Sequence, residues 1–177
     1  MDQNQIVFMV NTMINQIRAC LETDLPTITE IYNHAVLHTT AIWNETTVSM
    51  ENRAAWWEAR KAQGYPVLVA VDNQDRVLGY ASFGDWRAFE GFRFTVEHSI
   101  YVAHEAQGKG VGLALLTELI HSAKALNKKV MVAAIEAQNE GSIALHQSLG
   151  FEQTGLMKGV GFKFDRFLDL LWMQKTL

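Results

Sequence analysis

Three glycines alternate along a short turn between an apolar run and a segment with helical periodicity. The turn is Gln107-Gly108-Lys109-Gly110-Val111-Gly112, and it follows the apolar run Ile100-Tyr101-Val102. Glycine permits positive φ angles and leaves space beside the backbone. A strand that passes through such a turn into a helix directs free backbone N–H groups and the positive end of the helix dipole at one place. The segment therefore predicts a strand–turn–helix unit that binds an anion such as a phosphate or a pyrophosphate.

Two common phosphate-binding motifs do not fit this turn. A P-loop requires Ser or Thr directly after its lysine, and Gly110 stands there. A dinucleotide-binding G-x-G-x-x-G motif would need its last glycine at Leu113 or Leu115. The acidic residue expected about 20 residues further on is also missing, and Lys128 and Lys129 occupy that region. A glycine-rich turn without any ligand would give the same pattern, so spacing alone leaves the ligand open.

Length and composition bound the class of protein. The chain has 177 residues, of which 49% are hydrophobic, which suits one domain with a sizeable core. A net charge of −4 argues against non-specific binding to nucleic acid. The single cysteine, Cys20, excludes an internal disulfide and fits a reducing compartment. Because there is no long apolar run and no signal-peptide pattern, we expect a soluble, cytoplasmic protein with no membrane partner.

Hydrophobic periodicity predicts one α/β domain over residues 13–177, preceded by an N-terminal extension of residues 1–12. Apolar residues at helical spacing predict four helices, the first capped by Thr23 or Asp24 with Pro26 in its first turn. The other helices are predicted over residues 50–61 (capped by Ser49), 109–126 and 140–148. Strands are predicted over residues 14–19, 66–71, 77–83, 94–102, 130–135, 151–157 and 167–174, the last two joined by a glycine-rich connection. This order predicts a mixed sheet flanked by helices.

The strand over residues 94–102 alternates strictly, so its two faces can be assigned from the sequence. One face carries Phe94, Val96, His98, Ile100 and Val102. The other face carries Thr95, Glu97, Ser99 and Tyr101, and is polar enough to border a cleft.

These motifs together resemble the GNAT acyltransferase superfamily. The resemblance rests on the strand, the Q-x-x-G-x-G turn and Asn139-x-x-Ser142 one strand later, and it covers roughly residues 14–177. Four further segments are similar to the phosphinothricin and methionine sulfoximine/sulfone acetyltransferases: residues 31–36, 83–87, 95–99 and 145–151. The resemblance implies a GNAT-type α/β fold with a central mixed sheet, splayed at the acyl-CoA strand. It also implies an enzyme that acetylates the α-amine of small amino acids.

The resemblance further implies acetyl-CoA as the co-substrate at the glycine turn. In the family the backbone of this turn binds the CoA pyrophosphate, and the splayed strand pairs with the pantetheine arm and offers an oxyanion donor. Lys109 either assists with phosphate charge or is a solvated lysine, and Asn139 is a good helix N-cap as well as a pantetheine contact. The predicted cofactor-binding residues are Ile100, Tyr101, Val102, Gln107, Gly108, Lys109, Gly110, Val111, Gly112, Leu113, Asn139 and Ser142.

Glu97 and His146 are the predicted catalytic residues. An amino acid's amine is mostly protonated at neutral pH, so a carboxylate beside the acceptor must take a proton before attack. Charged residues are mostly exposed, and only the similarity of residues 95–99 to the family favours Glu97 as that base. His146 stands where many family members carry a tyrosine general acid, and it either protonates the leaving thiolate or packs near the cofactor.

An amino-acid acceptor also needs a cation for its carboxylate. Arg87 is the best candidate because guanidinium pairs bidentately with carboxylate, and Arg93 competes for this role. The aromatic side chains of four residues either form a pocket wall or belong to the core: Trp43, Trp86, Phe89 and Phe94. The predicted substrate-binding residues are Arg87, Ala88, Phe89, Glu97, His98 and Ser99.

The sequence also bears on metal ions, on other partners and on alternative activities. We expect no metal site, because His34 and His38 lie four apart without the glutamate of H-E-x-x-H. We expect no nucleic-acid partner, and a homodimer in which the apolar segment 167–173 makes a contact. The alternatives are the same chemistry on another amine, such as a polyamine, an antibiotic or a protein N-terminus, and a non-catalytic acyl-CoA sensor.

Overall fold

The computed structural model describes residues 14–177. The predicted N-terminal extension over residues 1–12 lies outside the described residues. In chain order the elements are β1 (Gln16–Ala19), the 3₁₀ turn η1 (Glu22–Asp24), α2 (Leu25–His38), α3 (Met50–Ala62), β2 (Val67–Val71), β3 (Val77–Asp85), η2 (Glu90–Phe92), β4 (Thr95–Val102), η3 (His104–Ala106), α4 (Val111–Ala125), β5 (Val130–Glu136), α5 (Glu140–Ser148), β6 (Glu152–Lys163) and β7 (Arg166–Thr176).

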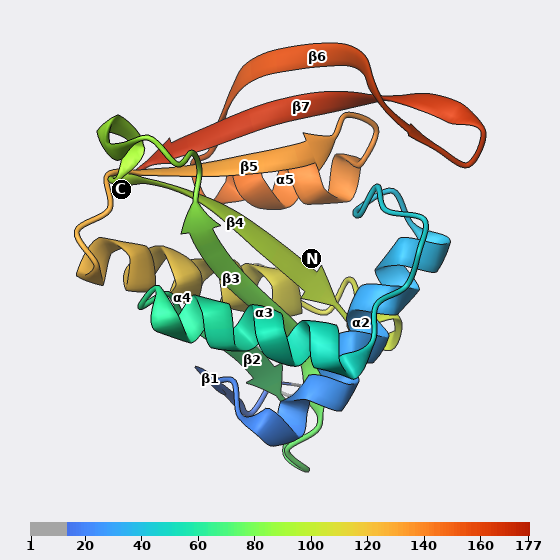
Figure 1. Ribbon diagram of the computed structural model, residues 1–177, viewed down its shortest axis with the longest axis vertical. Helices are drawn as coiled ribbons and strands as arrows, with labels where there is room; N and C mark the ends of the chain where they lie inside the picture. Colours follow the sequence, from blue (N-terminus) through green and yellow to red (C-terminus); the bar gives the residue numbers. More distant parts are fainter. Residues whose placement is uncertain (1–13) are drawn as a thin grey trace, which may run out of the picture.

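The strands form one seven-stranded mixed sheet in the order β1-β2-β3-β4-β5-β7-β6 (Figure 1). β2, β3 and β4 form an antiparallel meander. β4 and β5 are parallel neighbours, and α4 lies between them in the chain. The remaining pairs are antiparallel. The mixed α/β sheet predicted from the sequence is confirmed.

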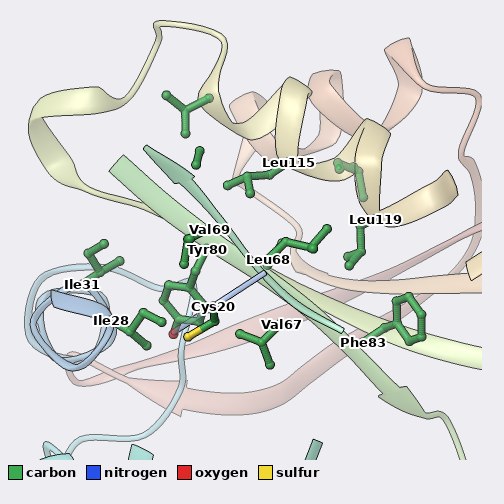
Figure 2. Packing of buried hydrophobic residues seen from close by; sticks show 14 of the residues in the cluster. Cys20, Ile28, Ile31, Val67, Leu68, Val69, Tyr80, Phe83, Leu115 and Leu119 are labelled. Carbon is green, nitrogen blue, oxygen red and sulfur yellow. The ribbon is translucent and has the colours of Figure 1, made fainter. Parts of the chain in front are cut away.

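Helices cover both faces of the sheet. On one face Tyr101 of β4 packs edge-on against Tyr32 of α2, with ring centroids 6.1 Å apart. On the opposite face α4 and α5 pack against the sheet, and Leu115 of α4 lies over Gly79 of β3. Figure 2 shows the same division within the core, with the α2 side chains near Tyr80 and the α4 side chains near Leu68. Because alternate residues of β2 and β3 enter opposite layers, both strands are apolar along nearly their whole length.

Most predicted helix ends are confirmed by their capping contacts. The Ser49 hydroxyl accepts a hydrogen bond from the Asn52 backbone N–H at the start of α3. Asn139 Oδ1 accepts from the Ser142 N–H at 3.0 Å at the start of α5. Gly150 follows α5 with a φ of 80°, which a residue with a Cβ adopts only at a cost.

The predicted cap at the start of α2 is corrected by the structure. Asp24 is the N-cap residue, but its side chain makes no capping hydrogen bond to the helix. Its carboxylate instead accepts two hydrogen bonds from the Arg18 guanidinium, at 2.7 and 3.0 Å, and one from the Leu21 N–H. The buried carboxylate therefore ties β1 to η1, because a guanidinium offers it more hydrogen bonds than the helix end does.

The predicted glycine-rich connection between the last two strands is wrong. β6 and β7 continue to a two-residue turn, Phe164-Asp165, and both residues have positive φ angles, as in a type I′ hairpin. The glycines lie within β6, where the strand register shifts. A Cβ at Gly161 would collide with the Trp43 ring, so this glycine makes room for an aromatic side chain rather than for a loop. The resulting hairpin forms one edge of the sheet (Figure 1).

Candidate active site

β4 and β5 separate directly after Glu97. The parallel pairs run from Thr95–Val130 to Glu97–Val132, and beyond them β4 stays with β3 while β5 stays with β7. The Ala103 N–H donates to the Leu78 carbonyl of the neighbouring segment. Since successive N–H groups of a strand point to opposite edges, those of residues 98, 100 and 102 face the opening. The sheet thus offers an unpaired strand edge to a ligand, as the splayed strand of the prediction requires.

Two cavities line this opening and share walls. The larger one, of about 580 Å³, extends over the glycine turn, and the smaller one, of about 300 Å³, lies at the branch point beside Glu97. Both are lined by Ala41, Ile100, Tyr101, Asn139 and Ser142. The two cavities therefore form one continuous groove.

The glycine turn adopts the backbone conformation that an anion site needs. Gly108 and Gly110 have φ angles of 70° and 81°. Gly110 is the N-cap of α4, and Gly110, Val111 and Gly112 line the larger cavity, so the unpaired N–H groups of the first helical turn lie beside the groove. Eleven of the twelve predicted cofactor-binding residues line the larger cavity: Ile100, Tyr101, Val102, Gln107, Gly108, Gly110, Val111, Gly112, Leu113, Asn139 and Ser142.

Lys109 is the exception among the predicted cofactor-binding residues. Its Nζ donates to the Glu105 carbonyl at 2.7 Å, and its side chain lines a different surface depression near Asp72. In this conformation the ammonium caps the 3₁₀ turn η3 instead of facing the groove.

Glu97 lies half-buried at the branch point, in the smaller cavity. Burial raises the pKa of its carboxyl above the usual range, and the positive charge of Arg87 partly opposes this shift. A carboxylate with a raised pKa holds a proton more readily at neutral pH, which is what a general base for an ammonium group needs. Ser99 lines the same cavity two residues further along the strand.

His98 and His146 meet on the opposite face of β4. Their Nε2 atoms are 3.0 Å apart, and the Nδ1 of His146 lies 2.6 Å from the Ser142 carbonyl oxygen. Both rings are buried and pack edge-on against Phe151. Burial lowers the pKa of His98 to about 3 and also lowers that of His146, so both imidazoles are neutral at pH 7.

The predicted carboxylate-binding segment does not line the groove. Arg87, Ala88 and Phe89 are exposed, and none of them borders either cavity. The Arg87 guanidinium stacks over the Trp86 ring at 4.5 Å and donates to the Trp86 carbonyl. Arg93 is likewise turned to its own segment, where it donates to the Glu90 carbonyl. Of these side chains, only Arg87 influences Glu97, through its charge.

Two polar side chains of the smaller cavity, Thr40 and Glu136, are absent from the predicted site, whereas Trp43, predicted as either a pocket wall or core, does line this cavity. Thr40 and Trp43 come from the segment after α2, and Glu136 ends β5. Glu136 as a whole residue is only 6% exposed, and its carboxylate accepts one long hydrogen bond, 3.4 Å, from the Thr40 hydroxyl. The sequence did contain a signal for Glu136, because a charged residue at the end of an apolar strand, just before a helix cap, indicates a place at the edge of the sheet where a site can form. The segment of Thr40 and Trp43 has no periodicity that would place it against the groove.

A model of the Acetyltransferase (GNAT) family matches residues 28–151. The chain belongs to this family.

Individual relatives agree with this assignment. An L-methionine sulfoximine/L-methionine sulfone acetyltransferase of Salmonella typhimurium is 60% identical over 161 residues, which are 91% of this chain and 94% of the relative. A phosphinothricin N-acetyltransferase of Alcaligenes faecalis is 39% identical, over 91% of this chain and 82% of that protein. A solved structure of an acetyltransferase of Salmonella typhimurium with its cofactor acetyl-CoA superposes with a TM-score of 0.90 and 59% identity, covering 94% of this chain and 95% of the other. The predicted superfamily and its amino-acid-acetylating subgroup are thereby confirmed.

The described residues were also compared with the requirements of a membrane-spanning helix and of a metal site. None of the helices within residues 14–177 is long and apolar enough to cross a membrane. Within the same residues, no three His, Cys, Asp or Glu side chains are grouped so that they could hold a metal ion.

Proposed function

We propose that this GNAT protein transfers the acetyl group of acetyl-CoA to the α-amine of small L-amino acids, with methionine sulfoximine, methionine sulfone and phosphinothricin-like compounds as acceptors. One observation carries the proposal: the open edge of β4, the glycine turn and the half-buried Glu97 lie along a single groove. The names of the relatives, which include acetyltransferases of these compounds, support the choice of acceptor.

The groove suits direct attack within a ternary complex. Backbone N–H groups of the turn and the first turn of α4 hold the pyrophosphate, while the open edge of β4 pairs with the pantetheine arm. Glu97 takes a proton from the acceptor ammonium, and the freed nitrogen attacks the thioester carbonyl. A C–N bond forms, the C–S bond breaks and CoA leaves as its thiolate. The N–H of Ile100, which faces the opening, is the proposed donor to the oxyanion.

His146 is proposed as the acid that protonates the thiolate. It lies on α5 and lines the smaller cavity together with Ile100 of the open edge of β4. The neutral ring carries its single hydrogen on Nδ1, where it is donated to the Ser142 carbonyl, so this Nδ1–H is the proton that the thiolate would receive. The second proton that the attacking nitrogen sheds as the amide forms balances this loss and returns the ring to its neutral form.

The acceptor carboxylate is proposed to bind Arg87, with Arg93 as the competing candidate. Arg87 is exposed, and among residues 14–177 its guanidinium contacts Trp86, so it can turn to a ligand without breaking a buried ion pair. Its charge already acts on Glu97, which supports its placement beside the acceptor amine. Ala88 and Phe89 would then border the acceptor from the same segment.

A panel of acceptors tests the proposed function. Purified protein is incubated with acetyl-CoA and each amine, and the released CoA thiol is measured. We expect turnover with methionine sulfoximine, methionine sulfone and phosphinothricin, and none with a polyamine, an aminoglycoside or a peptide N-terminus. Turnover with only one of these other amines would assign the chemistry to that amine. Tight acetyl-CoA binding without turnover on any amine would instead identify an acyl-CoA sensor.

We also propose that two copies of the chain pair through the β6–β7 hairpin, and that the protein works in the cytoplasm. The predicted contact segment 167–173 is corrected in part, because Leu168, Leu171 and Met173 are buried in the core and Phe167 is exposed. Six large apolar side chains of the hairpin are about half or more exposed: Leu156, Met157, Val160, Phe162, Phe164 and Phe167. An exposed apolar patch of this kind is typical of a protein–protein contact. The single buried Cys20 fits a reducing compartment.

A further inference from the structure

The contact between His98 and His146 joins two elements that otherwise separate at the groove. His98 is the first residue of β4 after the last pair with β5. His146 lies on α5, which follows β5 in the chain. Their 3.0 Å contact therefore spans the opening on its α5 side, at the point where the strands diverge.

The hydrogen bonds of this pair fix the tautomer of each ring. The Ser142 carbonyl can only accept, so the Nδ1 of His146 carries a hydrogen. A neutral His146 then has a bare Nε2, and the hydrogen of the 3.0 Å contact belongs to the Nε2 of His98. The Nδ1 of His98 is left as a lone pair, which agrees with its being buried without a hydrogen-bond partner among the described residues.

The chain of hydrogen bonds continues from His146 to the two predicted pantetheine contacts. The Ser142 carbonyl accepts from His146, and the Ser142 N–H donates to Asn139 Oδ1 at 3.0 Å. Ser142 and Asn139 line both cavities of the groove. The orientation of the first turn of α5 relative to β4 thus depends on His98 through His146.

We propose that His98 is a positioning residue for the acetyl-CoA site, which donates its Nε2–H to His146 and thereby holds Ser142 and Asn139 at a fixed distance from the open edge of β4. The inference rests on the proposed function, since it presumes that acetyl-CoA lies in this groove. It adds a role on the cofactor side of the strand to a residue that was predicted only as a border of the acceptor site.

The surroundings of the pair contain few other charges. Glu97 of β4 and Glu136 of β5 lie near the branch point, but strand alternation directs both to the face opposite His98. From β6, Phe151 packs against both rings and carries no charge. Burial is the main cause that lowers the pKa of His98, and the neighbouring His146 adds to it, because a proton on one ring would disfavour a proton on the other.

Two substitutions at one position separate the hydrogen bond from the bulk of the ring. His98→Gln keeps an N–H donor at the place of Nε2, and His98→Leu keeps the volume without a donor. We expect His98→Leu to raise the acetyl-CoA dissociation constant about tenfold, as for the loss of one buried hydrogen bond. His98→Gln should recover most of this loss. His121→Leu, at an exposed position of α4, serves as the control and should leave the constant unchanged.

The outcomes distinguish this inference from the proposed function. Wild-type protein that binds no acetyl-CoA in calorimetry would refute the function. Normal binding by wild type together with equal constants for wild type and His98→Leu would refute the role of His98 alone.

Nuclear magnetic resonance of the wild-type protein gives a second test that needs no variant. In ¹⁵N-labelled protein at pH 7, His98 should show the Nε2–H tautomer and His146 the Nδ1–H tautomer, both without charge. Binding of acetyl-CoA should move the signals of both rings and keep these tautomers. The opposite tautomer at either ring would overturn the inference, because the hydrogen bond could not then run from His98 to His146.

Discussion

Glu97 owes its proposed role to its place at the last paired residue of β4. On one side it is supported by the intact sheet, and on the other it faces the opening between β4 and β5. Half-burial raises the pKa of its carboxyl without a neighbouring carboxylate being needed, and Arg87 sets how far the pKa rises. A side chain in this position combines a fixed backbone with access to the acceptor.

The substitution Glu97→Gln tests this role at the scale of one residue. We expect kcat to fall by about 10²- to 10⁴-fold, as is typical for the loss of a general base, while acetyl-CoA binds as before. Since the carboxylate form is the active one, kcat/KM of the wild type should fall with decreasing pH through the raised pKa, and this limb should vanish in Glu97→Gln. Glu152→Gln, at an exposed position of β6, is the control. An unchanged kcat would remove Glu97 from the mechanism.

Sequence alone could locate Glu97, but it could not predict which side chains from distant parts of the chain contact one another around the groove. Strand alternation gave the face of Glu97, and its similarity to family members gave the role. The contact between His98 and His146 joins residues 48 positions apart, and no periodicity encodes their distance. Arg87 could be named for its chemistry, yet its stacking on Trp86 depends on a loop conformation that no pattern predicts.

At the scale of elements, the glycine turn joins β4 to α4 through backbone conformations that a side chain disfavours. Gly108 and Gly110 hold positive φ angles in succession around Lys109. The sequence predicted this turn well, because each glycine is a local requirement of the backbone.

Gly110→Val is expected to disturb the turn and raise the KM for acetyl-CoA about tenfold or more. A β-branched residue at a φ of 81° costs roughly 1–2 kcal/mol, which the turn relieves by moving its N–H groups from the pyrophosphate position. Gly64→Val is a matched control, because Gly64 has a φ of 73° at the end of α3, away from the groove, with open space around it. Both variants should lose similar stability in urea denaturation. A normal KM in folded Gly110→Val would contradict the assignment of the turn.

A second element-scale feature is the attachment of the segment after α2 to the β6–β7 hairpin. The buried ammonium of Lys163 donates to the carbonyls of Val36, Thr39 and Ile42, and the Trp43 ring fills the space beside Gly161. This attachment could not be predicted, because the sequence indicated a glycine-rich loop where β6 actually continues.

Lys163→Met is expected to loosen the acceptor side of the groove and leave the cofactor side intact. Three carbonyls lose the donor that matched them, which costs about 1–3 kcal/mol or more of unfolding free energy. Thr40 and Trp43 then lose their fixed place, so the KM for the amino acid should rise several-fold while acetyl-CoA binding stays the same. Lys158→Met, an exposed lysine of the same strand, is the control. A rise in both constants would indicate general damage to the fold and contradict this selective role.

At the scale of the whole molecule, the buried histidine pair links stability to pH. The pKa of His98 is about 3 in the folded protein and 6.5 as its ordinary value. Because the folded state keeps His98 neutral, its contribution to stability is complete above pH 6.5 and is lost as the pH falls from 6.5 towards 3.

Urea denaturation at several pH values checks this linkage. Between pH 6.5 and pH 4.5 the wild type should lose roughly 2–3 kcal/mol more unfolding free energy than His98→Gln, whose side chain does not titrate. Carboxylates with lowered pKa values, such as Asp72, add an acid loss of their own, but that loss is common to both proteins. Parallel pH profiles for the two proteins would show that His98 is not buried as a neutral ring.

Exposed aromatic residues of the β6–β7 hairpin bear on the assembly of the molecule. The Phe162 and Phe167 rings pack edge-on, 5.2 Å apart, yet they are 51% and 73% exposed. If two hairpins cover each other, wild-type protein should sediment as twice the 20.0 kDa chain. The double substitution Phe162→Ser and Phe167→Ser should then sediment as a single chain.

Leu126→Ser is the matched control for this experiment, because Leu126 is 43% exposed outside the hairpin and the groove and should affect neither assembly nor KM. The hairpin also carries Lys163, which holds the acceptor side of the groove. Dissociation should therefore raise the KM for the amino acid more than that for acetyl-CoA. A wild-type protein that sediments as one chain at all concentrations would rule out pairing through the hairpin, and its exposed aromatic residues would then need another partner.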